Sequence, residues 1–160
     1  MNNLTMFCLT LEPSHQKFIK ELGYTPVGLG EKKFSNNNNN EWFTDKSGIS
    51  ISEKNKNYGE YTFHYWLWKN YIDLNQVKDG WFGFCQYRKF WSIEKNNLFP
   101  SAISELKPMV LTKIPKSYEN FDAILGDLHF INRFKIMKFL KIYHQLFRLF
   151  LWKRWNLLVF

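Results

Sequence analysis

Residues 81–89 read WFGFCQYRK, an apolar run that changes to polar residues within one position. A short aromatic run after the turn pair Asp79-Gly80 predicts a central β-strand over residues 81–85. Apolar residues occupy both faces of this strand, which is typical of a strand buried between two layers. Polar chemistry begins at its carboxyl end, where open α/β sheets bind their ligands. Residues 86–89 (QYRK) are therefore the first candidate site.

Other apolar segments on either side of this strand predict the rest of the sheet. Residues 4–11 read LTMFCLTL and predict a buried strand near the N-terminus. Residues 24–29 form a weaker extended segment, because a proline and a glycine interrupt it. Further strand candidates lie at residues 109–114 and 121–125, the second of which leads into Gly126-Asp127.

Two helices are expected between these strands. Ser14 is a candidate N-cap for a helix that runs to Leu22. Asn57, with Glu60 three residues later, has the capping-box pattern and predicts a helix over residues 58–71. Aromatic residues recur along that helix at three- and four-residue spacing, which predicts that several of its sides are buried. Strands that alternate with helices favour an α/β fold with a mainly parallel sheet flanked by helices.

The distribution of charge divides the chain into two regions. The 160 residues carry a net charge of +8, from 22 basic and 14 acidic side chains. Seven of the basic and none of the acidic side chains lie in residues 133–160, which leaves the preceding residues with only +1. We therefore expect one α/β domain over residues 1–129 and a basic amphipathic helix over residues 130–160. Hydrophobic residues make up 45% of the chain, which argues against an intrinsically disordered protein.

Several classes of protein find no support in the sequence. Cys8 and Cys85 are far apart and lie in apolar runs, so we expect two reduced core cysteines, which suits a cytoplasmic protein. The N-terminus has no signal-peptide pattern, and no apolar run is long enough to cross a bilayer. The sequence has no P-loop, G-x-G-x-x-G loop or G-x-S-x-G motif. It also has no D-x-D, H-E-x-x-H or clustered cysteines, so no metal ligands are predicted.

Two groups of residues can carry chemistry, and each also has an ordinary structural explanation. Arg88 can bind a phosphate or diphosphate through two hydrogen bonds, and Lys89 adds a point charge. The alternative is two solvated cations at a strand end. Glu60 and His64 lie one helical turn apart, where Glu60 can accept a proton. The alternative here is a capping glutamate beside a histidine in an aromatic core.

Residues 82–87 (FGFCQY) overlap the RNP1 strand pattern of RNA-recognition modules. The leading basic residue and glycine of that pattern are missing in register. In such modules the aromatic residues face outward to stack on bases, whereas here they cover both faces of the strand. A nucleic-acid partner is therefore not expected. A non-catalytic module that binds RNA or an anionic surface is the alternative to an enzyme.

The middle of the chain contains four short sequence motifs in a fixed order: residues 45–55 (DKSGISISEKN), 57–62 (NYGEYT), 65–70 (YWLWKN) and 83–90 (GFCQYRKF). This pattern resembles a bacterial family of glycosyltransferases of capsular and exopolysaccharide synthesis, catalogued as a domain of unknown function. The corresponding motifs of that family resemble D-x-x-G-x-x-I-S, N-x-x-Y-x-E-x-T, Y-W-x-W-K-N and G-x-x-H-Y-R-R-Y/F. Several such motifs in the right order make the resemblance specific.

The resemblance implies a GT-A-like, Rossmann-like fold and sugar transfer from a nucleotide-sugar donor to a polysaccharide or lipid-linked acceptor, in capsule, exopolysaccharide or lipopolysaccharide synthesis. Arg88 and Lys89 would stabilise the departing nucleoside diphosphate. A carboxylate, Glu60 or Asp127, would be the base if the reaction inverts configuration. The expected substrate-binding residues are Asp45, Asn55, Trp68, Gln86, Tyr87, Arg88 and Lys89. A divalent metal ion is compatible with this chemistry, but without a D-x-D motif we assign it no ligands.

Two departures from the family pattern bear on activity. Gln86 stands where family members carry histidine, and glutamine cannot act as an acid or a base. Beyond Asp127 the family motifs are no longer recognisable, so we expect a truncated, divergent or frame-shifted end. An inactive remnant of a glycosyltransferase is therefore a further alternative for the protein. The tryptophans and cations of residues 130–160 predict an interfacial helix on anionic lipid, which would place the protein in the cytoplasm at the inner membrane face. The alternatives for this segment are a core helix with a solvated basic face and an end that does not pack.

Overall fold

The computed structural model describes residues 4–34, 42–73, 80–92, 100 and 102–126. The chain divides into two compact units, Met1–Ile124 and Leu125–Phe160, and every element below lies in the first. Asp127 and the predicted basic helix over residues 130–160 lie outside the described residues.

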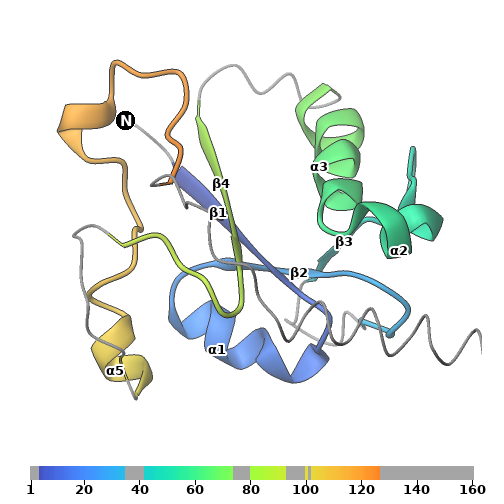
Figure 1. Cartoon of the computed structure of the whole chain (residues 1–160), viewed down its shortest axis with the longest axis horizontal. Helices are drawn as coiled ribbons and strands as arrows, with labels where there is room; N and C mark the ends of the chain where they lie inside the picture. The colour runs from blue at the N-terminus through green and yellow to red at the C-terminus, as the bar shows by residue number, and fades with distance from the viewer. Residues whose placement is uncertain (1–3, 35–41, 74–79, 93–99, 101, 127–160) are drawn as a thin grey trace, which may run out of the picture. The chain divides into compact units, whose positions relative to one another are not determined.

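Four parallel strands form the described sheet, in the order β3-β2-β1-β4 (Figure 1). This confirms the predicted α/β fold with a parallel sheet. The two segments with the most continuous apolar sequence, β1 and β4, pair with each other along their length. The strands are β1 (Leu4–Thr10), β2 (Thr25–Gly28), β3 (Phe43–Thr44) and β4 (Trp81–Gln86).

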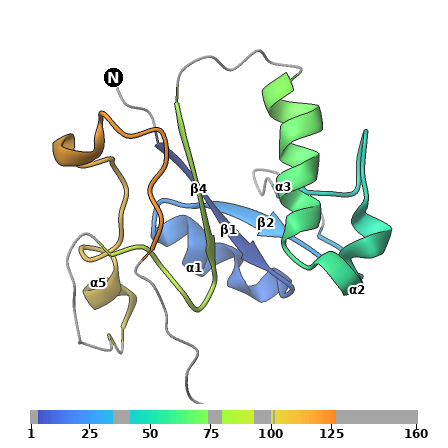
Figure 2. The same ribbon diagram turned by 45° about the horizontal axis from the view of Figure 1, so that its top comes forward.

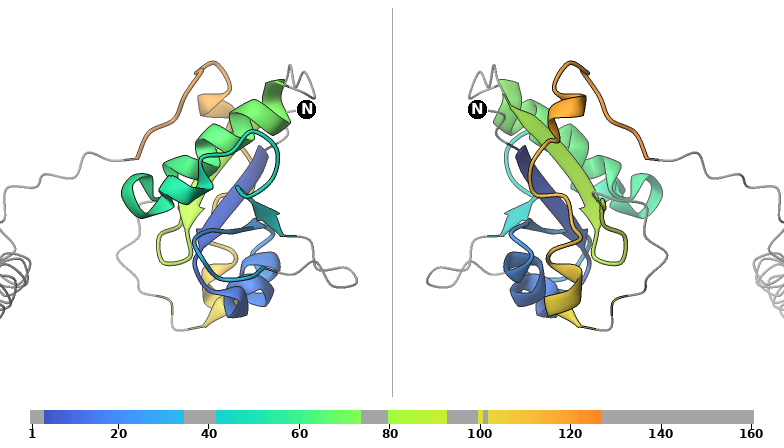
Figure 3. Two further views of the ribbon diagram at one scale, coloured as in Figure 1. Left: turned by 90° about the vertical axis from the view of Figure 1, so that its right-hand side faces the viewer. Right: turned by 90° about the vertical axis from the view of Figure 1, so that its left-hand side faces the viewer.

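Helices cover both faces of this sheet (Figure 3). On one face, α1 (Gln16–Glu21) packs with α5 (Ile103–Leu106) against a core that includes Met6 and Cys8. On the other face, α3 (Tyr61–Leu67) and its π-helical continuation Trp68–Ile72 pack against Phe7 and Leu9. Successive side chains of β1 point to opposite faces, so its unbroken apolar sequence supplies both cores.

Cys8 and Cys85 are free and buried, which confirms the prediction of two reduced core cysteines. They occupy paired positions on β1 and β4. The pKa of the Cys85 thiol is raised because of its hydrogen bond with Cys8 and because burial disfavours the thiolate. Both groups are therefore part of the packing.

The helix predicted over residues 58–71 is wrong in its first turn (Figure 2). A separate short helix, α2 (Asn55–Tyr58), ends at Gly59, which has φ of 57°, a conformation that side-chain-bearing residues rarely adopt. Asn57 lies inside α2, and Glu60 is the N-cap residue of α3 without a side-chain capping bond. The predicted capping box therefore does not form.

The aromatic stripe of this region is also less buried than its spacing predicts. Tyr58, Tyr61 and Trp68 are all at least half exposed. The residues that enter the core lie between them and include Phe63 and Trp66.

Four further expectations on the elements were wrong. Residues 109–114 form only an isolated antiparallel bridge, from Val110 to Ser92, and residues 121–125 form no strand. Ser14 lies inside the 3₁₀ turn Pro13–His15, and α1 has no side-chain cap. The predicted central strand, β4, is an end strand of the described sheet. Its outer edge is partly covered, because the indole Nε1 of Trp91 donates to the carbonyl of Phe84 at 2.8 Å.

Candidate functional site

The order in which the strands are added to the sheet reverses beside β1. The chain passes from β1 to β2 on one side and returns to β4 on the other side. Because the strands are parallel, their carboxyl ends share one edge. In open α/β sheets this reversal of strand order is where ligands bind, beside the carboxyl ends of the two strands that flank it. The candidate site is therefore built by the residues that follow Thr10 and Gln86.

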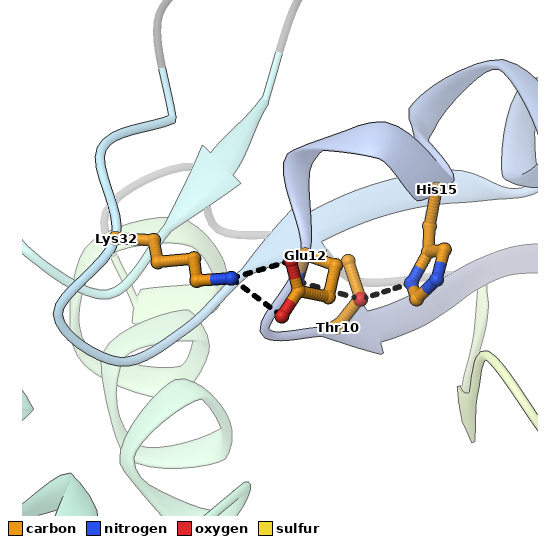
Figure 4. Close-up of polar contacts among 4 residues, drawn as sticks. All are labelled: Thr10, Glu12, His15 and Lys32. Atoms are coloured by element: carbon orange, nitrogen blue, oxygen red, sulfur yellow. Dashed lines mark hydrogen bonds and ion pairs between the residues drawn. The ribbon is translucent and has the colours of Figure 1, made fainter.

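On the β1 side, a short polar network follows the strand (Figure 4). The side-chain oxygen of Thr10 lies 2.7 Å from Nδ1 of His15 and accepts the backbone N–H of Glu12 at 3.0 Å. Thr10 is almost fully buried, whereas His15 is half-buried. Lys32 donates to both carboxylate oxygens of Glu12 at 2.5 Å. This ion pair neutralises the acidic group nearest to the strand end.

On the β4 side, Tyr87 extends the pairing with β1, since its N–H donates to the carbonyl of Leu9 at 3.3 Å. Its ring stacks on the ring of His15, with a centroid distance of 4.3 Å and an angle of 24°. The guanidinium carbon of Arg88 lies 5.0 Å from the Tyr87 ring centroid. Arg88 and Lys89 are exposed. Both cations are therefore accessible to a ligand at this edge.

Gln86 and Glu60 come from separate sequence motifs, and their side chains are in contact at this edge. The Nε2 group of Gln86 donates to Oε2 of Glu60 at 2.6 Å. The Glu60 side chain is thus oriented toward the end of β4. The partner is a neutral amide, so this contact brings no cation to the Glu60 carboxylate.

His64 lies one turn beyond Glu60, with its ring centroid 4.2 Å from that of Phe84. Its Nε2 atom is buried and has no hydrogen-bond partner among the described residues. Burial lowers the pKa of His64, and the negative charge of Glu60 partly opposes this effect. His64 is therefore a core histidine beside the candidate site.

Asp45 follows β3 and is completely buried. Neither of its carboxylate oxygens has a hydrogen-bond partner among the described residues. Its loop is fixed to α3, because Nε1 of Trp66 donates to the carbonyl of Ser47 at 2.7 Å. Asn70 also bonds both backbone groups of Ile49, at 2.8 Å each. In this arrangement a substrate does not reach the Asp45 carboxylate.

Two other predicted residues have contacts that explain them structurally. Asn55 donates to the carbonyl of Gly59 and to the hydroxyl of Thr62, at 2.8 and 3.0 Å, and so fixes the break between α2 and α3. Trp68 is half exposed beyond α3, with Nζ of Lys69 3.5 Å from its ring centroid. Asp127 lies outside the described residues.

His15 also belongs to this edge, although the sequence patterns did not predict it. Only the pairing of β1 with β4 brings its ring onto Tyr87, and this pairing is not visible in local patterns. The available signal was a run of polar residues directly after the first strand, the same signal that identified residues 86–89.

The described part of the chain has neither a candidate membrane span nor a candidate metal site. None of its helices has the length and apolarity needed to cross a membrane. No three of its histidine, cysteine, aspartate or glutamate side chains are grouped so that they could hold a metal ion.

The fold and the site define an α/β protein with polar residues gathered where the strand order of a parallel sheet reverses. The chain belongs to the family described as Domain of unknown function (DUF4422), whose pattern matches residues 9–150. This confirms the prediction, made from the sequence motifs, that the chain belongs to a domain-of-unknown-function family. The family match continues past Asp127, whereas the motifs quoted above end before it. No curated protein and no solved structure matches the chain.

Proposed function

We propose that this protein is a glycosyltransferase that moves a sugar from a nucleotide-sugar donor to a polysaccharide or lipid-linked acceptor, in capsule, exopolysaccharide or lipopolysaccharide synthesis. One observation carries the proposal: exposed Arg88 and the Glu60–Gln86 pair lie together at the carboxyl end of β4, beside β1. These residues come from two of the motifs that resemble the glycosyltransferase pattern, NYGEYT and GFCQYRKF.

The chemistry of glycosyl transfer needs two kinds of group, and this edge offers both. The leaving nucleoside diphosphate gains negative charge, which the Arg88 guanidinium can stabilise through two hydrogen bonds while Lys89 adds a point charge. The acceptor hydroxyl has to lose a proton, and Glu60 is a carboxylate held in place by Gln86. In this scheme Gln86 acts as a positioning residue, so the replacement of histidine by glutamine still permits activity.

The proposed setting is the cytoplasm, at the inner face of the membrane. Free Cys8 and Cys85 are compatible with a reducing compartment. Nucleotide sugars supply the donor there, and a lipid-linked acceptor would lie in the adjacent membrane. The basic residues of 133–160 would hold the protein near anionic lipid.

The test uses the full chain with a panel of nucleotide sugars, with binding measured by calorimetry. We expect at least one donor to bind, and Arg88→Ala to weaken its binding at least about tenfold, because a charge-assisted hydrogen bond contributes about 1.5–3 kcal/mol. Lys113→Ala removes another exposed cation, far along the chain, and should leave the affinity unchanged.

Turnover separates binding from catalysis. With a donor that binds, Glu60→Gln should abolish transfer while it leaves donor affinity within about twofold. A folded protein that binds none of the donors would refute the proposal. Salt-sensitive RNA binding by the same sample would then favour the non-catalytic alternative.

A further inference from the structure

His15 is held in place by two contacts with different directions. Its ring lies against Tyr87 at 4.3 Å, which sets the plane of the ring. Its Nδ1 atom lies 2.7 Å from the Thr10 hydroxyl, which sets the rotation within that plane. The remaining ring nitrogen, Nε2, has no partner among the described residues. A half-buried histidine fixed at one nitrogen has a single orientation for the other.

The hydrogen bonds of Thr10 decide which nitrogen carries the proton. Its hydroxyl oxygen already accepts the N–H of Glu12. The hydroxyl hydrogen itself needs an acceptor, because Thr10 is only 3% exposed and cannot donate freely to water. Among the described residues that acceptor is Nδ1 of His15. A hydroxyl that donates to Nδ1 leaves the ring proton on Nε2, because a hydrogen bond at one ring nitrogen sets the histidine tautomer.

The groups around His15 favour a negatively charged ligand. Arg88 lies 5.0 Å from the Tyr87 ring on which His15 stacks. The distance from the His15 ring centroid to the guanidinium carbon is at most the sum of the two ring distances, 9.3 Å. A diphosphate that accepts a hydrogen bond of about 2.8 Å at each end is long enough to bridge His15 and Arg88 across a separation of this size. Glu12 does not oppose an anion here, because Lys32 binds both of its carboxylate oxygens.

We propose that His15 binds the diphosphate of the donor through its Nε2–H group, together with Arg88. Thr10 is then a positioning residue that selects the tautomer. The inference rests on the proposed function only for the identity of the ligand, since an N–H donor beside a guanidinium would bind diphosphates from any source.

The tautomer is tested without any ligand. In the ¹⁵N spectrum of the full chain, we expect the His15 signals to show an unprotonated Nδ1 and a protonated Nε2, with His15→Gln used to assign them. Thr10→Val keeps the shape of the side chain and removes the hydroxyl, so it should abolish this preference. A protonated Nδ1 in the unmodified protein would overturn the inference, whatever the protein binds.

Ligand binding is tested with two variants that place an amide at different points. His15→Gln puts its amide near the position of Nε2, whereas His15→Asn reaches only the position of Nδ1. With inorganic pyrophosphate and with nucleoside diphosphates as probes, calorimetry should show near-normal affinity for His15→Gln. It should show at least about tenfold weaker binding for His15→Asn. Unfolding curves of both variants check that they fold.

The outcomes separate this inference from the proposed function. If His15→Asn binds every probe as tightly as the unmodified chain, and Arg88→Ala does not, the assignment of His15 fails while the glycosyltransferase proposal stands. If pyrophosphate binds through His15 but no nucleotide sugar binds, the proposed function fails and the diphosphate site stands. If neither pyrophosphate nor any nucleoside diphosphate binds, the assignment of His15 is refuted.

Discussion

At the scale of single residues, Asp45 has the least expected environment. It is completely buried, and neither carboxylate oxygen has a hydrogen-bond partner among the described residues. An unpaired buried charge is unfavourable, so Asp45→Asn, which keeps the shape and removes the charge, should raise the free energy of unfolding by about 1–2 kcal/mol. Urea denaturation measures this, with exposed Asp122→Asn as a control that should change little. A less stable Asp45→Asn protein would mean that the carboxylate has a partner in solution.

His64 makes a prediction about pH. Burial lowers its pKa below the usual 6.5 in the folded protein, so protonation favours the unfolded chain. Stability attributable to neutral His64 should be complete above about pH 6.5 and should decline as the pH falls through the folded-state pKa. Unfolding curves measured between about pH 5 and about pH 8 should show a weaker pH dependence of stability for His64→Gln than for the unmodified chain.

The same histidine reports on the charge of Glu60. Because Glu60 raises the pKa of His64, Glu60→Gln should lower that pKa further. A proton NMR titration of His64 measures the shift. Glu53→Gln removes an exposed carboxylate on the preceding 3₁₀ turn, and this control should leave the titration unchanged. An increase in the pKa on replacing Glu60 would contradict the contacts described.

The site shows what residue patterns can and cannot predict. Arg88 and Lys89 were predictable, because a polar segment after an apolar strand marks the ligand-binding edge of a parallel sheet. Glu60 was predicted from its spacing to His64 and its place in the segment NYGEYT, and its side chain reaches the same edge by pairing with Gln86, whereas the capping box that was its structural alternative does not form. His15 was missed, because its contact with Tyr87 depends on which strands are neighbours.

At the scale of elements, the loop after β3 is fixed to α3 at two points, by Trp66 and Asn70. Gly48 in this loop has φ of 61°, and a Cβ there would lie 2.1 Å from Oδ1 of Asn70. Gly48→Ala therefore strains the backbone and displaces Asn70 from two hydrogen bonds worth about 1 kcal/mol each. Gly23→Ala is the matched control, since Gly23 has φ of 79° and open space around it.

We expect the free energy of unfolding of Gly48→Ala to be about 2 kcal/mol lower than that of Gly23→Ala, because both carry the backbone strain and only the first disturbs Asn70. Urea denaturation provides the comparison. Equal losses would show that the contacts of Asn70 contribute nothing to the stability of this loop.

The two longest strands of the described sheet have a sequence pattern that is strong over their whole length. β1 and β4 are almost continuously apolar, and both were located within a residue or two. The helix over residues 58–71 was predicted as one piece, because aromatic spacing continues across Gly59, where the backbone breaks. Residues 109–114 are as apolar as a strand, yet they make one bridge only, because strand formation requires a neighbouring strand that the local sequence does not reveal.

At the scale of the whole molecule, charge is distributed very unevenly along the sequence. Residues 133–160 carry seven of the 22 basic side chains and no acidic ones. Each lysine or arginine near an anionic membrane contributes about 1 kcal/mol of attraction. If this segment holds the protein at the membrane, replacing Lys135, Lys138 and Lys141 by glutamine should weaken binding to phosphatidylglycerol vesicles by about 3 kcal/mol, or more than about a hundredfold.

The control for this prediction has to remove the same charge elsewhere. Glutamine at Lys107, Lys113 and Lys116 does so at exposed positions of the first unit. Vesicle sedimentation should show near-normal binding for this triple variant, and binding of the unmodified chain should fall steeply with salt, because screening shortens the reach of the surface potential. Equal weakening by the two triple variants would mean that net charge alone governs binding. Equal affinity for uncharged phosphatidylcholine vesicles would mean that the tryptophans and phenylalanines of the segment, and not its cations, bind the lipid.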